Sequence, residues 1–102
     1  MIKVQTIQGN LNSSGVKIYE AKIPSKIIKL NIVNPTNIPY TVELFKYNAD
    51  SGLDIFPIYK FELNAGDTLK DTDGYLLDSG DFLLGKSNSD KTLFIVEIDA
   101  SI

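Results

Sequence analysis

Few residues in this chain are of the types that carry out catalysis. The 102-residue sequence contains neither His nor Cys, so it lacks the commonest general base and metal ligand and any thiolate nucleophile. Ser14 and Lys17 have the S-x-x-K spacing, but they lie in a turn that leads into a strand and not at a helix start. Glu43 and Glu62 fall on apparent strand exteriors, whereas glycoside hydrolysis needs one carboxyl with a raised pKa. We therefore expect a protein that is not an enzyme.

Metal binding could involve only oxygen ligands, which suit calcium. Asp71-Thr72-Asp73-Gly74 begins like a calcium loop, but its glycine comes two positions early and no Glu closes the ring. Asn48, Asp50 and Asp54 form a second oxygen-rich turn. Asp and Asn also favour turns because they bond their own backbone. We predict turn chemistry at both places, with no metal and no cofactor.

The charge balance limits the partners of the chain. Ten Lys and no Arg stand against thirteen acids, a net charge of −3, which disfavours nucleic-acid binding. No signal-like or membrane-spanning apolar run occurs, so we expect no membrane partner and synthesis in a cytoplasm. Residues 1–51 carry six Lys and three acids, whereas residues 52–102 carry four Lys and ten acids. This asymmetry indicates either solvated turns or two surfaces of opposite sign that pack against like subunits.

The composition is that of a strand-rich protein. Thirteen Ile and ten Phe or Tyr stand against four Ala, and apolar residues alternate with a period of two. Turn signals every eight to twelve residues are typical of sandwiches and barrels. We predict an all-β fold, an antiparallel β-sandwich (jelly-roll or Ig-like) of about 7–8 strands. It forms one domain, 1–102, with 1–15 as an extended N-terminal strand or arm. The predicted strands are 2–8, 16–23, 27–34, 40–47, 56–63, 68–70, 81–87 and 92–99.

The alternation also assigns side chains to faces. In 27–34, Ile28, Leu30 and Ile32 share one face. The run 92–98 is apolar on both faces, which indicates a strand that is central or covered by a partner. Leu63–Leu69 and Leu77–Leu83 repeat the same pattern, a Gly-Asp turn between leucines, and predict two similar corners of one sandwich.

Exposed aromatic side chains are candidates for stacking on sugars. The four candidates are Tyr40, Tyr47, Tyr59 and Tyr75. Carbohydrate modules usually rely on Trp, which is absent here, and Tyr in strands more often packs with its hydroxyl at the rim. We predict packing roles for these residues.

The order of these features resembles a family of small virion proteins of tailed bacteriophages. Residues Val16–Asn34 contain the tyrosine, the proline corner and the basic residue that lead into a strand ending in Asn. The strand Tyr40–Lys46 follows, and Leu63–Leu69 resembles the "L-x-A-G-x-T" corner of the family. Gly74–Asp81 resembles its "G-x-x-L-x-x-G-D" segment. The chain departs from the pattern at Phe82-Leu83-Leu84, where the family has small residues, and in its proline-rich loop 34–39.

This resemblance, which covers residues 16–102, implies an auxiliary or head-decoration capsid protein of the kind found in crAss-like phages. It implies many copies in the virion, bound to the major capsid protein and other virion proteins, with copies of itself as a further partner. A head–tail or tail-fibre role and a carbohydrate- or host-surface-binding module are the alternatives. We expect contacts through a lysine-containing strand and the loop that follows it. The alternative is that the lysines of this strand only protect a sheet edge from pairing. The expected contact residues are Lys22, Lys26, Lys29, Asn34, Thr36, Asn37 and Tyr40.

Overall fold

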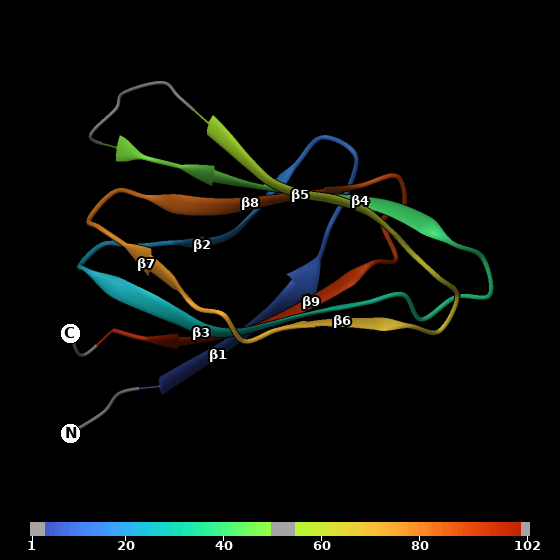
Figure 1. Cartoon of the computed structure of the whole chain (residues 1–102), viewed down its shortest axis with the longest axis horizontal. Coiled ribbons are helices and arrows are strands. Elements are labelled where there is room, and N and C mark those ends of the chain that lie inside the picture. The colour runs from blue at the N-terminus through green and yellow to red at the C-terminus, as the bar shows by residue number, and fades with distance from the viewer. Residues whose placement is uncertain (1–3, 50–54, 101–102) are drawn as a thin grey trace.

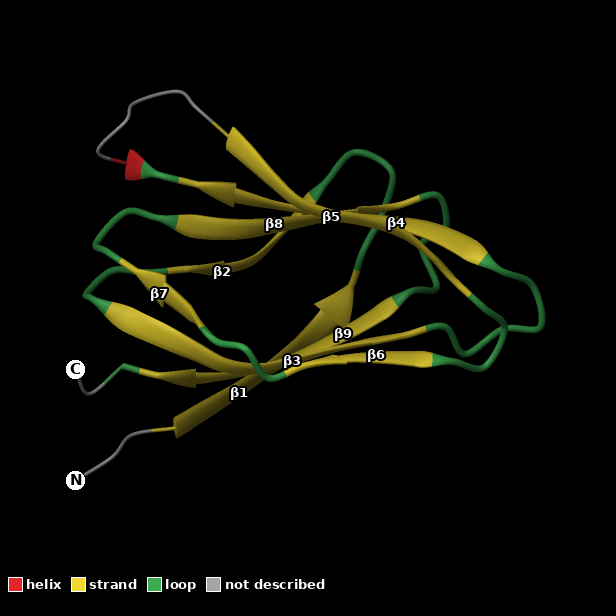
Figure 2. Cartoon of the chain, in the orientation of Figure 1, coloured by secondary structure: helices red, strands yellow, loops and turns green. Residues whose placement is uncertain are grey.

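The chain forms two antiparallel β-sheets that pack face to face, as upper and lower layers in Figure 1. The computed structural model describes residues 4–49 and 55–100, the side chains of 55–57 excepted. Strands account for most of this part, apart from a short helical turn at Ala49 (Figure 2). The lower layer, sheet A, contains β1 (Val4–Asn10), β3 (Ser25–Val33), β6 (Thr68–Asp71), β7 (Tyr75–Leu77) and β9 (Leu93–Asp99). The upper layer, sheet B, contains β2 (Val16–Glu20), β4 (Tyr40–Tyr47), β5 (Ile55–Leu63) and β8 (Phe82–Ser87).

The strand order decides between the two predicted sandwich types. Sheet A runs β1-β9-β3-β6, with β7 also paired to β3, and sheet B runs β2-β8-β4-β5. Successive strands therefore alternate between the sheets, except for the hairpin β4–β5 and the pair β6 and β7. With β6 and β7 sharing one edge position, each sheet has four strand positions, and this order is that of a jelly roll.

The predicted 7–8 strands become nine because one edge position of sheet A is filled twice. Both β6 and β7 pair with β3, the first along Leu30–Val33 and the second along Ser25–Ile27. The interruption falls at Gly74, whose positive φ of 83° is a conformation that glycine adopts without strain. Strand β7 was missed by the sequence prediction, because three residues are too few to show an alternation.

The hydrophobic core fills the space between the sheets. Alternation turns Val42 and Leu44 of β4, and Val96 and Ile98 of β9, toward the space between the sheets, and all four are fully buried. Burying each such side chain stabilises the fold by about 1.5–3 kcal/mol. The other buried core residues are Leu11, Ile18, Ala21, Ile27, Leu30, Ile32, Leu63, Leu77, Leu83 and Phe94.

The two predicted Gly-Asp corners are confirmed as matching turns. In the first, the Asp67 N–H donates to the Asn64 carbonyl at 3.0 Å, and in the second the Asp81 N–H donates to the Asp78 carbonyl at 3.0 Å. The glycines Gly66 and Gly80 have φ of 74° and 92°. The first corner takes the chain from sheet B to sheet A, and the second returns it to sheet B.

Two local details of the predicted strands were wrong. A bulge between Ile27 and Lys29 shifts the register of β3, so that Ile27, not Ile28, faces the core with Leu30. The first strand is predicted to end at residue 8, yet β1 continues through Gly9 to Asn10. A Cβ atom at Gly9 would lie 2.9 Å from the Phe94 ring, so this glycine permits a close approach between neighbouring strands.

The charges of the two halves of the sequence are mixed by strand pairing. In sheet A, Lys26 stands opposite Asp99 and Lys29 opposite Glu97. Strands from the first half are neighbours of strands from the second half in both sheets. The described residues therefore do not form one basic and one acidic surface.

Candidate interaction surfaces

The residues predicted to contact a partner do not form one continuous patch. Lys22 and Lys26 are exposed at the start of β3, and Lys29 is half-buried further along the outer face of sheet A. The loop 34–39 follows the opposite end of β3, so about 30 Å of strand separates it from Lys22. Whether either group binds a partner stays a prediction.

Within that loop, Asn34 is a buried hub and not a surface contact. Its side-chain amide donates to the carbonyls of Ile38 at 2.6 Å and Leu63 at 3.0 Å. Its Oδ1 accepts from the Thr36 N–H at 3.0 Å and from the Thr36 hydroxyl at 2.7 Å. Asn34 is 0% exposed, so these bonds fix the shape of the loop. Asn37 is exposed there, as are Pro35, Ile38 and Pro39, whereas Thr36 is half-buried.

Tyr40 is also buried, at the start of β4. Hydrogen bonds with the side chains of Ser89 and Thr36 lower the pKa of its phenol. The ring therefore closes the loop end of the sandwich, which agrees with the packing role expected for the tyrosines. It offers no free face for stacking on a sugar.

The outer face of sheet B carries a cluster that we call the aromatic row: Phe45 and Tyr47 of β4 with Phe82 and Leu84 of β8. The cross-strand pairs are Phe45 with Leu84 and Tyr47 with Phe82. The rings of Tyr47 and Phe82 stack with centroids 4.6 Å apart and planes 12° from parallel. All four residues are half-buried, whereas the outer face of such a sheet is ordinarily polar.

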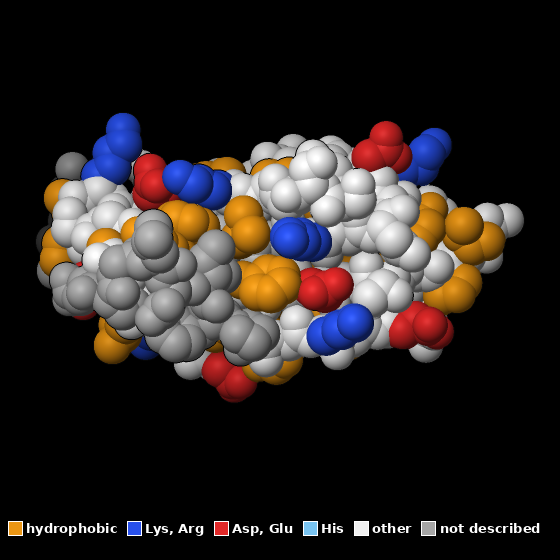
Figure 3. Space-filling view, turned by 90° about the horizontal axis from the view of Figure 1, so that it is seen from above, with side chains coloured by type: hydrophobic (Ala, Val, Ile, Leu, Met, Phe, Trp, Pro, Cys, Tyr) orange, Lys and Arg blue, Asp and Glu red, His pale blue; other side chains and the backbone are white. Residues whose placement is uncertain are grey.

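Two lysines border the aromatic row. The Lys17 ammonium lies 4.5 Å from the centroid of the Phe82 ring, and the Lys86 ammonium lies 5.4 Å from that of Phe45. Lys17 also pairs with the Glu20 carboxylate at 2.7 Å. Figure 3 looks onto this side of the molecule and shows hydrophobic side chains with lysines among them. The surface therefore combines apolar area with positive charge held over aromatic rings.

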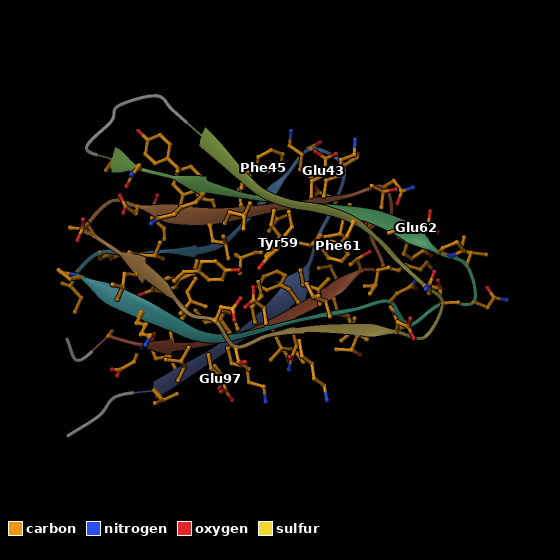
Figure 4. All side chains as sticks on the ribbon, in the orientation of Figure 1. Glu43, Phe45, Tyr59, Phe61, Glu62 and Glu97 are labelled. Atoms are coloured by element: carbon orange, nitrogen blue, oxygen red, sulfur yellow. The ribbon has the colours of Figure 1, made fainter. Side chains whose placement is uncertain are left out.

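Beside the aromatic row lies a small polar hollow of about 150 Å³. It is lined by Ser13, Thr41, Glu43, Lys86, Ser87 and Asn88. Figure 4 shows Glu43 and Phe45 on the outer side of sheet B, while Tyr59 and Phe61 point toward sheet A. The hollow thus offers both hydrogen-bond donors and acceptors next to an aromatic side chain.

The predicted oxygen-rich turn at Asp71 is occupied by protein groups. The Asp71 carboxylate accepts from the Asp73 N–H at 2.9 Å and from the Tyr75 hydroxyl. Burial, together with hydrogen bonds to Asp71 and Tyr59, raises the pKa of Tyr75. This pattern is turn chemistry of the predicted kind. Asp50 and Asp54, in the other candidate turn, lie outside the described residues.

Sequence reasoning did not identify the aromatic row as a surface. The signal was present in Phe82-Leu83-Leu84, which is apolar on both faces of one strand. In the sequence, this run stands out only as a departure from the pattern of the phage family. Alternation alone does not distinguish a central buried strand from one whose outer face is left for a partner.

The comparisons with known proteins support the fold. No protein-family model matches the chain, and no curated protein matches it in sequence. Among solved structures, it is similar to a chain of Bacillus endospore appendages, described as a family of disulfide-linked pili. That match has 9% identity and a TM-score of 0.55, and it covers 100% of this chain and 88% of the other. Such a low identity establishes a shared fold alone.

Two oxalate oxidase structures, one in complex with the substrate analogue glycolate, also match. Each has 14% identity and a TM-score of 0.28, covering 94% of this chain and 51% of the other. This likeness is too low to carry an argument. Within residues 4–49 and 55–100, no helix has the length and apolar character needed to cross a bilayer.

Proposed function

We propose that this chain is a non-enzymatic structural protein of a phage virion, most specifically an auxiliary capsid protein that binds the major capsid protein lattice in many copies. It is made in the host cytoplasm and acts in the assembled particle. The aromatic row is the observation that carries this proposal, because it gives an otherwise ordinary sandwich an apolar surface suited to a protein partner. The likeness in fold to a chain of an appendage pilus is compatible with a structural role.

The chemistry of the aromatic row fits a protein interface. Aromatic side chains dominate the binding energy of interfaces, where truncating a central one costs about 2 kcal/mol or more, or ~30-fold in affinity. Lys17 and Lys86 add charge that can select an acidic rim on the partner. Modest single contacts become strong attachment when many copies bind one lattice. Because the chain has no Cys, its attachment does not use disulfides between subunits.

Mass spectrometry of purified particles encoded by the genome that carries this sequence tests the assignment. We expect the chain in mature particles at a copy number that is a simple multiple of the lattice symmetry. Its absence from mature particles would refute the proposal.

Co-sedimentation with empty shells tests the surface. We expect Phe82→Ser with Leu84→Ser to raise the Kd for shells at least ~30-fold. Leu93→Ser is the matched control, since Leu93 is 36% exposed on the outer face of sheet A, and it should leave occupancy unchanged. Charge reversal at Lys22, Lys26 and Lys29 tests the surface expected from the sequence. If only this reversal abolishes binding, the aromatic row is not the contact.

The polar hollow favours a second candidate, a carbohydrate- or host-surface-binding module. Its mixed donors and acceptors match sugar hydroxyls, and Phe45 and Tyr47 lie on the same face. A glycan array followed by titration of any hit distinguishes the two functions. Specific binding that Glu43→Gln weakens, with no binding to shells, would favour this candidate.

A further inference from the structure

Among residues 4–49 and 55–100, one strand edge of the sandwich carries none of the devices that usually protect such edges. Strand β1 ends sheet A, pairing with β9 on one side and with no described strand on the other. Its register against β9 runs from Val4 to Asn10 without a bulge. The sequence VQTIQGN contains no charged residue and no proline. Alternate N–H and C=O groups along about 24 Å of backbone therefore face outward as a template for another strand.

The other three edges of the described sandwich are protected. Strand β2 has a bulge and the Lys17–Glu20 ion pair. Strand β5 has a bulge, Lys60, and Pro57, which lacks an N–H. Strands β6 and β7 share the remaining edge and are only four and three residues long, and β6 also carries Lys70. Because charges, bulges, proline and short length are what proteins use against edge pairing, their absence from β1 alone marks it as different.

The side chains of β1 are self-complementary. Gln5, Ile7 and Gly9 face the core side of sheet A, since they stand opposite Ile98, Val96 and Phe94. Thr6 and Gln8 face outward beside Glu97 and Ile95. Antiparallel pairing of two β1 strands about Ile7 keeps each side chain on its own face. It places Thr6 opposite Gln8 of the second copy, twice by symmetry, and opposes no like charges.

We propose that the open edge of β1 pairs with β1 of a second copy of this chain, joining two sheets A into one continuous sheet across a two-fold axis. The contact is isologous, the arrangement that most homodimers use. It covers Ile7, which is only partly buried and packs against the core, and Val4, which is 50% exposed. One strand pair buries less than a standard interface, so the dimer dissociates on dilution. This inference does not depend on the proposed function.

Sedimentation velocity over a concentration series tests the pairing with the full chain in solution. We expect a monomer–dimer equilibrium for the wild type. Thr6→Lys with Gln8→Lys should raise the dimer Kd about tenfold, because two symmetric Lys–Lys pairs then oppose each other. Thr6→Lys with Gln8→Glu should restore association to within about threefold of the wild type, since each Lys then faces a Glu. Thermal unfolding confirms that each variant is folded.

Thr68→Lys is the matched control, because Thr68 lies on the opposite edge of sheet A at an exposed position. It should leave the dimer Kd unchanged. In hydrogen-exchange measurements, the amides of β1 should exchange more slowly as protein concentration rises. A wild type that stays monomeric up to about 1 mM would overturn the proposal. An equal rise in the dimer Kd for the Lys–Lys variant and the Lys–Glu variant would also overturn it. Protection of β1 only on addition of a different protein would assign the edge to that protein instead.

Discussion

Substituting Gly85 by alanine measures how tightly the two sheets pack. Gly85 lies in the middle of β8 and faces the core, opposite Leu44. An added Cβ would lie 2.7 Å from Leu11 Cδ2 and 3.0 Å from Ile18 Cδ1. Leu11 and Ile18 are almost fully buried, so neither can swing into solvent.

The expected magnitude follows from two opposing effects. Overpacking a close-packed core costs about 1–3 kcal/mol. Replacing glycine by alanine lowers the conformational entropy of the unfolded chain and so stabilises the folded state by about 0.4–1 kcal/mol. This gain applies at Gly85 because its φ is not positive, so alanine can adopt the same backbone conformation. We expect Gly85→Ala to lower the free energy of unfolding by about 1–2 kcal/mol and the Tm by about 4–16 °C.

A double-mutant cycle identifies the cause of that loss. Leu11→Val removes the two Cδ atoms of Leu11, which lie close to the new methyl group. The loss of unfolding free energy caused by Leu11→Val should therefore be smaller in the Gly85→Ala protein than in the wild type, by at least about 0.5 kcal/mol. Gly66→Ala is the control. Its Cβ would meet no atom within 4 Å, but its φ is +74°, so its cost of about 1–2 kcal/mol comes from backbone conformation. Urea denaturation measures all variants. A Gly85→Ala protein as stable as the wild type, or strict additivity with Leu11→Val, would refute the packing argument.

Three further predictions concern buried polar groups. Asn34→Ala should cost about 2–3 kcal/mol in urea denaturation, because the carbonyls of Ile38 and Leu63 lose their donor; a loss below about 0.5 kcal/mol would contradict the role of hub. Asp81→Ala should cost about 2–3 kcal/mol, since the 2% exposed carboxylate accepts from the N–H groups of Ala49 and Asp78, whereas Asp67→Ala in the exposed matching corner should change stability by less than about 0.5 kcal/mol. Because burial and Asp71 raise the pKa of Tyr75, the folded chain keeps a proton that the unfolded chain loses, and stability should fall as pH rises above about 10. Tyr75→Phe should flatten this fall in denaturation curves at pH 8–11, and an unchanged slope would exclude Tyr75 as its source.

The sandwich could be predicted from the sequence because most strands obey a strict period of two. In β4 and β5 the predicted exterior positions of Glu43 and Glu62 agree with the observed register, and the run 92–98, predicted to be central or covered, lies between β1 and β3. The paired corners were also predictable, because Gly-Asp between leucines favours a turn in which the glycine takes a positive φ. These are local rules, and neighbouring strands did not override them.

The remaining features depend on contacts between distant residues. The bulge at Ile28 arises from the pairing of β3 with β9, and the glycine at position 9 is explained only by the Phe94 ring. The aromatic row exists because β4 and β8 are neighbours, although about 35 residues separate Tyr47 from Phe82. The dispersion of the predicted contact residues has the same cause, since β3 is long enough to place its two ends on opposite sides of the molecule.

The last strand of the chain occupies an inner position in sheet A, between β1 and β3. A nascent chain that ends at Lys91 therefore contains β1 and β3, the two neighbours of β9, but not the strand that joins them. Neither neighbour can complete its hydrogen bonds before β9 has been synthesised, so sheet A closes only after the other described strands have been made. Such non-local closure slows folding into the range of milliseconds to seconds, and during that interval the nascent polypeptide presents two open edges to chaperones or to other nascent chains.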